Sequence, residues 1–120
     1  MDLMDSATEN NHRKEDLIRT IRQRCASQKM QWTNHMMLRI MERGISLADV
    51  SCVLLTGEII EVYPSDYPYP SCLVWGHGEN QSCIHVVCGV GPEDLHLITA
   101  YHPDLARWEN EGKTRKEMSS

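Results

Sequence analysis

The strongest constraint on the fold is a change of hydrophobic period at Gly57, after which short alternating segments follow one another with brief turns between them. Period-two alternation is typical of half-buried β-strands. Because the turns are short, consecutive strands are expected to pair antiparallel as a meander. The pattern predicts strands at residues 58–63, 71–76, 83–90 and 95–101.

Helical periodicity dominates the chain before Gly57. Apolar residues recur at helical spacing in 14–29 and again in 33–43, where Thr33 is the expected N-cap and Gly44 the expected end. Ser46-Leu47-Ala48-Asp49 has capping-box spacing and opens a third, short helix. The tail from Asp104 to about Met118 is predicted to be helical. We therefore expect an α+β fold, with two to three N-terminal helices packed on a four-stranded antiparallel sheet and a C-terminal helix.

Length and composition predict a single domain. With 120 residues, the chain is expected to form one α+β domain over residues 13–118, preceded by a flexible segment at 1–12. No apolar run is long enough for a membrane span, and the first residues lack the order of a signal peptide. Five cysteines without a Cys-x-x-Cys pair indicate reduced thiols and a cytoplasmic location.

Charge is distributed unevenly along the chain. Residues 1–43 carry eight Lys or Arg and six Asp or Glu, whereas residues 44–120 carry four and eleven. No Lys or Arg occurs from Gly44 to Ala106. A surface that binds phosphate groups must therefore take its cations from the N-terminal helices or from the C-terminal tail, which includes Arg115.

Two sets of polar residues are candidates for a functional site. On the helix at 33–43, His35, Arg39 and Arg43 follow one another at four-residue spacing and form a stripe. On the strands, alternation places His85, Thr99 and Tyr101 on the face opposite the aliphatic residues. The alternative for either histidine is a buried structural residue that is bonded to the backbone.

Eight short motifs occur in an order that resembles a bacterial domain-of-unknown-function family grouped with RelE-like and barnase-like (BECR-type) ribonuclease toxins. They are Thr33-x-His35, Arg43-Gly44-Ile45-Ser46, Gly57-Glu58-Ile59-Ile60-Glu61, Tyr63-Pro64-x-Asp66-x-Pro68, Pro70-Ser71-Cys72-Leu73, His85-Val86-Val87, Ile98-Thr99-x-Tyr101-x-Pro103 and Trp108. The resemblance implies a compact helix-helix-sheet fold. It also implies a toxin role with a neighbouring antitoxin, which in some members is similar to a zinc-finger protein.

The activity implied by this resemblance is metal-independent cleavage of RNA, without a cofactor. Such a reaction needs an acid, a base and cations for the charge that builds on phosphorus. His35 and His85 are the candidate acid/base pair, Arg39 and Arg43 the phosphate clamp, and Tyr101 a further catalytic hydroxyl. Candidate substrate-binding residues are Tyr67, Tyr69, Thr99 and Arg115. The expected partners are RNA and a cognate antitoxin protein, and no membrane.

Rival functions belong to other classes. A metal site could use Cys83, His85, Cys88 and His96, but an odd spacing should direct the two cysteines to opposite faces of one strand. A nucleotide-cradling enzyme is disfavoured because no glycine-rich phosphate loop precedes a helix. The principal alternative is a non-catalytic, RelE-like interaction module that binds a partner protein through the Tyr67-Pro68-Tyr69-Pro70 loop.

Overall fold

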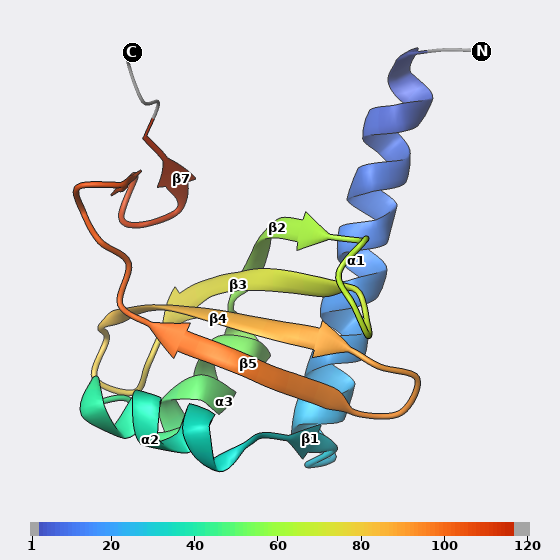
Figure 1. The fold of residues 1–120 in the computed structure, drawn as a ribbon. Helices are drawn as coiled ribbons and strands as arrows, with labels where there is room; N and C mark the ends of the chain where they lie inside the picture. The colour runs from blue at the N-terminus through green and yellow to red at the C-terminus, as the bar shows by residue number, and fades with distance from the viewer. Residues whose placement is uncertain (1–2, 117–120) are drawn as a thin grey trace.

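The structure is a computed structural model that describes residues 3–116. Within these residues, three helices and seven strands form a five-stranded sheet with its helices and a separate two-stranded hairpin (Figure 1). In chain order they are α1 (Leu3–Ala26), β1 (Met30–Gln31), α2 (Asn34–Glu42), α3 (Leu47–Thr56), β2 (Glu58–Tyr63), β3 (Ser71–His77), β4 (Cys83–Val90), β5 (Leu95–Tyr101), β6 (Trp108–Glu109) and β7 (Thr114–Arg115).

The predicted four-strand meander is confirmed, but it is only part of the sheet. Strands β2 to β5 pair antiparallel in sequence order, as the short turns require. The full order is β1-β5-β4-β3-β2, and β1 runs parallel to β5, so the sheet is five-stranded and mixed rather than four-stranded and antiparallel. The β1 strand was missed because two residues are too few to produce an alternating pattern.

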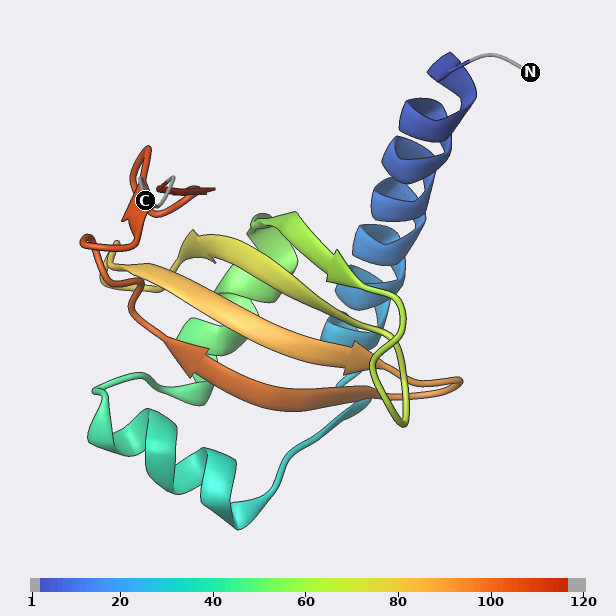
Figure 2. The same ribbon diagram turned by 45° about the horizontal axis from the view of Figure 1, so that its top comes forward.

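All three helices pack against one face of the sheet. Helices α1 and α3 lie behind the strands in the view of Figure 1, and α2 runs along the β5 edge, an arrangement that Figure 2 shows from a second angle. The core between the layers is aliphatic and includes Ile21, Ile40, Val53, Leu54, Val74, Val86 and Leu97. The opposite face of the sheet carries no helix among residues 3–116.

Helix boundaries follow the predicted caps more closely than the predicted lengths. The Thr33 hydroxyl accepts the Met36 N–H at 3.1 Å, and Gly44 has the left-handed φ of 69° that ends α2. The Ser46 capping box of α3 is also present. Helix α1 differs, because it spans Leu3–Ala26 instead of 14–29 and has no proline or glycine to interrupt it.

The prediction of a C-terminal helix over 104–118 is wrong for the described residues up to 116. The chain instead makes turns and the β6–β7 hairpin, with Trp108 buried at its start. Asn110, Glu111 and Gly112 all have positive φ values of 54°, 61° and 91°, which no α-helix accommodates. Residues 117 and 118 of the predicted helix lie outside the described residues.

Candidate functional site

Polar side chains of β2, β4 and β5 gather on the open face of the sheet. Glu61 and Tyr63 project from β2, His85 from β4 and Tyr101 from β5, in a register that places His85 opposite Tyr101 and Glu61 opposite Leu73. Leu73 is fully buried but is not part of the core beneath the helices. The open face therefore has a small apolar floor of its own under these polar groups.

A β-bulge places Glu61 on this face. The register between β2 and β3 shifts between Ile59 and Glu61, so that Ile60 is the extra residue. Because of the bulge, Glu58 and Glu61 both lie on the open side although they are three residues apart. In a regular strand, an odd spacing would have directed one of them into the core.

The C-terminal hairpin covers His85. The imidazole is fully buried, and its Nε2 donates a hydrogen bond of 2.6 Å to the carbonyl oxygen of Gly112. The indole of Trp108 packs edge-on against the imidazole, with 4.5 Å between the ring centroids. The prediction that His85 lies on the open face with Tyr101 is confirmed, and its ring also has the buried, backbone-bonded environment of the structural alternative.

Burial and hydrogen bonding together fix the proton on His85. Burial lowers the pKa of the imidazole, so the ring is neutral at pH 7 despite its bond to Gly112. With Nε2 protonated, Nδ1 is the acceptor, and the Tyr101 hydroxyl lies 3.4 Å from it. Burial also raises the pKa of Tyr101, which keeps its hydroxyl protonated. His85 can therefore orient the Tyr101 hydroxyl but is enclosed by protein.

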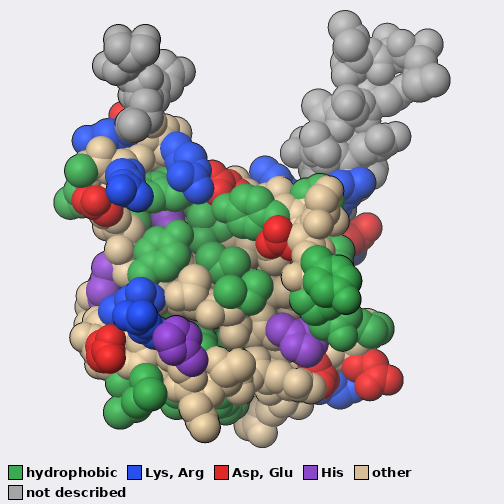
Figure 3. Space-filling model, viewed as in Figure 1, with side chains coloured by type: hydrophobic (Ala, Val, Ile, Leu, Met, Phe, Trp, Pro, Cys, Tyr) green, Lys and Arg blue, Asp and Glu red, His purple; other side chains and the backbone are tan. Residues whose placement is uncertain are grey.

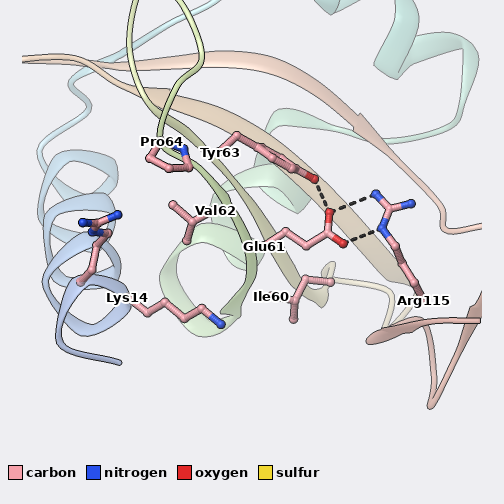
Figure 4. A pocket seen from close by; sticks show the side chains of 8 residues that line it. Lys14, Ile60, Glu61, Val62, Tyr63, Pro64 and Arg115 are labelled. Carbon is pink, nitrogen blue, oxygen red and sulfur yellow. Dashed lines mark hydrogen bonds and ion pairs between the residues drawn. The ribbon is translucent and has the colours of Figure 1, made fainter. Parts of the chain in front are cut away.

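Glu61 is the ionised group of the site. Arg115 donates to its two carboxylate oxygens, from Nε at 2.5 Å and from Nη2 at 3.0 Å, and the Tyr63 hydroxyl donates to it as well (Figure 4). The Arg115 hydrogen bond lowers the pKa of Glu61, so the carboxylate is charged at neutral pH. Burial and the bond to Glu61 raise the pKa of Tyr63 to about 12.

These side chains form one electrostatic unit, which we call the sheet-face cluster: Glu61, Tyr63, His85, Tyr101 and Arg115. His85 and Tyr101 are in contact, with 5.3 Å between their ring centroids, and Glu61 is hydrogen-bonded to both Tyr63 and Arg115. The charge of Glu61 also acts to raise the pKa of both His85 and Tyr101. The cluster contains an ionised carboxylate, two protonated hydroxyls and a guanidinium. It holds the components of proton transfer next to an anion-binding group.

Two of the predicted catalytic residues lie apart from this cluster. His35 and Arg39 are exposed on α2, and no hydrogen bond or ion pair joins either of them to the cluster in the described part of the chain. Arg39 instead faces Glu42 at 3.8 Å. The predicted stripe of His35, Arg39 and Arg43 is present on α2, but no hydrogen bond or ion pair joins its first two members to the open face of the sheet in the described part of the chain.

The third member of the stripe, Arg43, does reach the strands. Its Nη1 donates to the Thr99 hydroxyl at 3.1 Å and to the Ala100 carbonyl at 2.8 Å. Its charge acts to lower the pKa of Tyr101. Arg43 and Thr99 therefore border the sheet-face cluster on the β5 side, and Arg115 lies within it.

The two tyrosines predicted to bind substrate, Tyr67 and Tyr69, lie at the other end of the strands. The loop that holds them precedes Ser71, which pairs with Gly89, four residues along β4 from His85. Tyr69 stacks on His96 with 4.7 Å between ring centroids, and Tyr67 is 96% exposed. These rings are accessible for contacts, but they are not part of the cluster.

Sequence reasoning assigned no role to Glu61, Tyr63, Trp108 or Gly112. Glu61 and Tyr63 were recognised as members of an alternating strand, and the available signal was that two acidic residues three apart cannot both be exposed on a regular strand. Trp108 and Gly112 were placed in a helix that does not form. Their contacts with His85 depend on a hairpin that the sequence pattern did not indicate.

Cationic side chains lie at two borders of the cluster, with acidic side chains among them. In Figure 3, Lys and Arg side chains are visible on the C-terminal hairpin and beside α1, with Asp and Glu side chains next to them, while apolar and histidine side chains occupy the strands between these borders. Among the described residues, no group of three or more His, Cys, Asp or Glu side chains is arranged to hold a metal ion. No helix within residues 3–116 is long and apolar enough to cross a membrane.

Comparison with known proteins yields one family. The family described as "Domain of unknown function (DUF4258)" matches residues 32–102, more than half of the chain. The match covers α2 to β5 and leaves α1 and the C-terminal hairpin outside. No curated protein and no solved structure gave a match. The chain belongs to the DUF4258 family.

Proposed function

We propose that this member of the DUF4258 family is a metal-independent endoribonuclease of the toxin type. The observation that carries the proposal is the pairing of the ionised Glu61 with Arg115 on the same open face of the sheet as the protonated hydroxyl of Tyr101. Cleavage of RNA through its own 2′-hydroxyl requires a base, an acid and a cation at one place. The sheet-face cluster contains a group for each.

In the proposed reaction, Glu61 takes the proton of the 2′-hydroxyl while the 2′-oxygen bonds to phosphorus. Tyr101 gives its proton to the 5′-oxygen as the bond between that oxygen and phosphorus breaks. The products are a 2′,3′-cyclic phosphate and a 5′-hydroxyl end. Proton return from Glu61 to Tyr101 through solvent restores the site, so that atoms and charge balance.

Arg115 is the proposed stabiliser of charge on phosphorus. Its Nε and Nη2 hold Glu61, and Nη1 has no hydrogen-bond partner among the described residues, which leaves donors for a phosphate oxygen. A guanidinium suits this role because its donors lie in a fixed plane. His85 acts through Tyr101 as a positioning residue, since its buried ring accepts from that hydroxyl.

A second candidate function is a non-catalytic interaction module that binds a partner protein. The observation that favours it is the set of exposed apolar side chains outside the sheet-face cluster, which includes Leu38, Met41 and Ile98 at 59%, 66% and 50% exposure. If the protein is a toxin, a cognate antitoxin, of zinc-finger or another type, would bind to such a surface. Both candidate functions therefore include a partner protein, and only the first includes catalysis.

The test is an RNA cleavage assay with purified protein in the presence of a metal chelator. Glu61→Gln should lower kcat by about 10²-fold or more, the usual range for loss of a general base. Glu58→Gln is the matched control, because Glu58 lies on the same strand and pairs with Lys113 of the same hairpin at 2.8 Å. Glu58→Gln should retain cleavage within a few-fold.

Products and folding complete the test. Cyclic phosphate ends should be detected, and both variants should unfold cooperatively in urea. Equal activity in the two glutamine variants, or cleavage that disappears with chelator, would contradict the proposed reaction. Absence of cleavage by the wild-type protein on mixed RNA would favour the interaction module.

A further inference from the structure

A groove opens beside the sheet-face cluster, between α1 and the edge strand β2. Its volume is about 550 Å³, and it is lined by Arg13 and Lys14 of α1, by residues 60–64 and by Arg115 (Figure 4). Strand β2 is the last strand of the sheet, so the groove follows an edge that no other strand within residues 3–116 covers. Glu61, Tyr63 and Arg115 belong both to the groove and to the cluster.

The charge of this groove favours an anion. Three cationic side chains line it, and its one carboxylate, Glu61, is already engaged by Arg115 and Tyr63. In Figure 4, the side chain of Lys14 extends from α1 toward β2, on the side of the groove opposite Arg115. An anion in the groove would therefore meet cations from two separate elements of the fold.

The remaining surface of the groove suits a ligand that is partly apolar. Ile60, Val62 and Pro64 lie on the wall formed by β2 and the residue that follows it. The volume lies in the range of sites for small organic ligands and exceeds what a bare inorganic anion fills. A nucleotide combines a phosphate for the cations with a sugar and base for the apolar wall.

We infer that the groove is a subsite for the phosphate of the nucleotide next to the scissile bond, held by Arg13 and Lys14. This inference rests on the proposed ribonuclease function, because the groove shares Arg115 and Glu61 with the reacting centre. A single strand of RNA would then lie across β2, with one phosphate at Arg115 and its neighbour at α1. Substrates with a second phosphate are therefore cleaved better than those with one.

The experiment compares three substrate pools. The first contains all dinucleoside monophosphates, and the other two add one terminal phosphate at either the 5′ or the 3′ end. For the wild-type protein, one of the added phosphates should raise kcat/KM by about tenfold, as expected for one charge-assisted contact. The end that gives the gain identifies the direction in which the strand crosses β2.

Variants on α1 test whether the groove causes the increase in kcat/KM that the added phosphate brings. Arg13→Gln and Lys14→Gln should each reduce the ratio of kcat/KM with and without the added phosphate, and the double variant should bring it close to one. Arg19→Gln is the matched control, since it removes one charge from the same helix at an exposed arginine that pairs with Asp16. Its ratio should equal that of the wild type, because glutamine preserves the helix in all three cases.

A binding measurement separates the subsite from the reaction. A 2′-O-methyl oligonucleotide cannot be cleaved, and its affinity can be followed by fluorescence anisotropy over a range of salt concentrations. Each lost phosphate contact should lower the slope of log affinity against log salt by about 0.7. Suppose that the wild type binds the oligonucleotide but cleaves no RNA, and that Arg13→Gln and Lys14→Gln each show the lower slope. The subsite would then be supported and the proposed reaction would be wrong.

The converse results are equally decisive. If the wild type cleaves but an added phosphate brings no gain, and the α1 variants match Arg19→Gln, the subsite is wrong while the reaction stands. If the oligonucleotide does not bind to the wild type at all, both are wrong, and the groove would then be a candidate surface for an acidic segment of a protein.

Discussion

The imidazole of His85 and the carbonyl of Gly112 are 27 residues apart in the sequence and 2.6 Å apart in the structure. This contact attaches the C-terminal hairpin to the sheet. It also carries Arg115 to Glu61, because Gly112 and Arg115 belong to the same short hairpin. The stability of the hairpin and the assembly of the sheet-face cluster are therefore linked.

The first prediction concerns His85. Replacing it with alanine leaves the Gly112 oxygen without its donor and opens a cavity beside Trp108, so the free energy of unfolding should fall by about 2–4 kcal/mol. Urea denaturation followed by tryptophan fluorescence measures this loss. As a control, His35→Ala removes an exposed imidazole on α2 and should change the stability by less than about 0.5 kcal/mol. Equal losses of unfolding free energy in His85→Ala and His35→Ala would show that His85 does not hold the hairpin on the sheet.

The second prediction concerns Gly112. Its φ of 91° disfavours any other residue, and a Cβ atom there would lie 2.8 Å from Cγ of Pro103 and 3.0 Å from Sγ of Cys83. Gly112→Ala should therefore loosen the hairpin and increase hydrogen exchange of its amides. Gly44→Ala also replaces a glycine with positive φ, but nothing lies within 4 Å of a Cβ at that position. The effect of Gly44→Ala should therefore stay local to the end of α2.

The third prediction concerns pH. Burial lowers the folded-state pKa of His85 below its ordinary value of 6.5, so protonation favours the unfolded chain. The stabilising contribution of the neutral imidazole is present above pH 6.5 and is lost as the pH falls through the folded pKa. The limiting slope for one proton is about 1.4 kcal/mol per pH unit. Urea denaturation between pH 7.5 and 5 should show this decline in the wild type and a weaker one in His85→Gln.

Glu61 gives a separate decline at lower pH. Arg115 lowers the folded pKa of its carboxyl below 4.5, so the stability that this pair contributes is present above pH 4.5 and is lost as the pH falls through the folded pKa. Arg115→Gln should reduce the dependence below pH 4.5 and leave the His85 decline in place. A profile in which Arg115→Gln removes both declines would show that the two groups do not titrate separately.

The fourth prediction concerns the arginines of α2. Arg43 contacts Thr99 and Ala100 beside Tyr101, whereas Arg39 faces Glu42 in solvent. If the cluster cleaves RNA, Arg43→Gln should lower kcat/KM by about tenfold or more, in the range expected for a charged hydrogen-bond donor. Arg39→Gln should remain near the wild-type value. The reverse order would place the reaction on the exposed face of α2.

Local patterns predicted the local structure well. Alternation located β2 to β5, and short turns fixed their antiparallel order. The caps of α2 and α3 were read correctly because Thr33 and Ser46 bond to N–H groups only three residues away. Such interactions depend on spacing alone and are therefore visible in a sequence.

The rest depended on contacts between distant residues. The periodicity of α2 does not show that Leu38 and Met41 stay exposed while Met36 and Ile40 are buried, because that depends on where β5 lies. A second bulge, between Val87 and Cys88 in the pairing of β4 with β5, leaves Ile98 exposed, although alternation had placed it with the core residues. The sequence indicated Arg115 as a candidate substrate-binding cation, but it did not indicate that Glu61 is the partner of this arginine.

The bulge at Ile60 also determines how the hairpin attaches to the sheet. Lys113 forms an ion pair with Glu58 at 2.8 Å, and Arg115 forms one with Glu61 at 2.5 Å. The two cations are two residues apart in the sequence, whereas the two glutamates are three residues apart. Because Ile60 is the extra residue, the two glutamates lie opposite residues of β3 that are only two apart, so their spacing along the sheet matches that of the two cations. A strand without the bulge could present both carboxylates to the hairpin at this spacing only if it were one residue shorter.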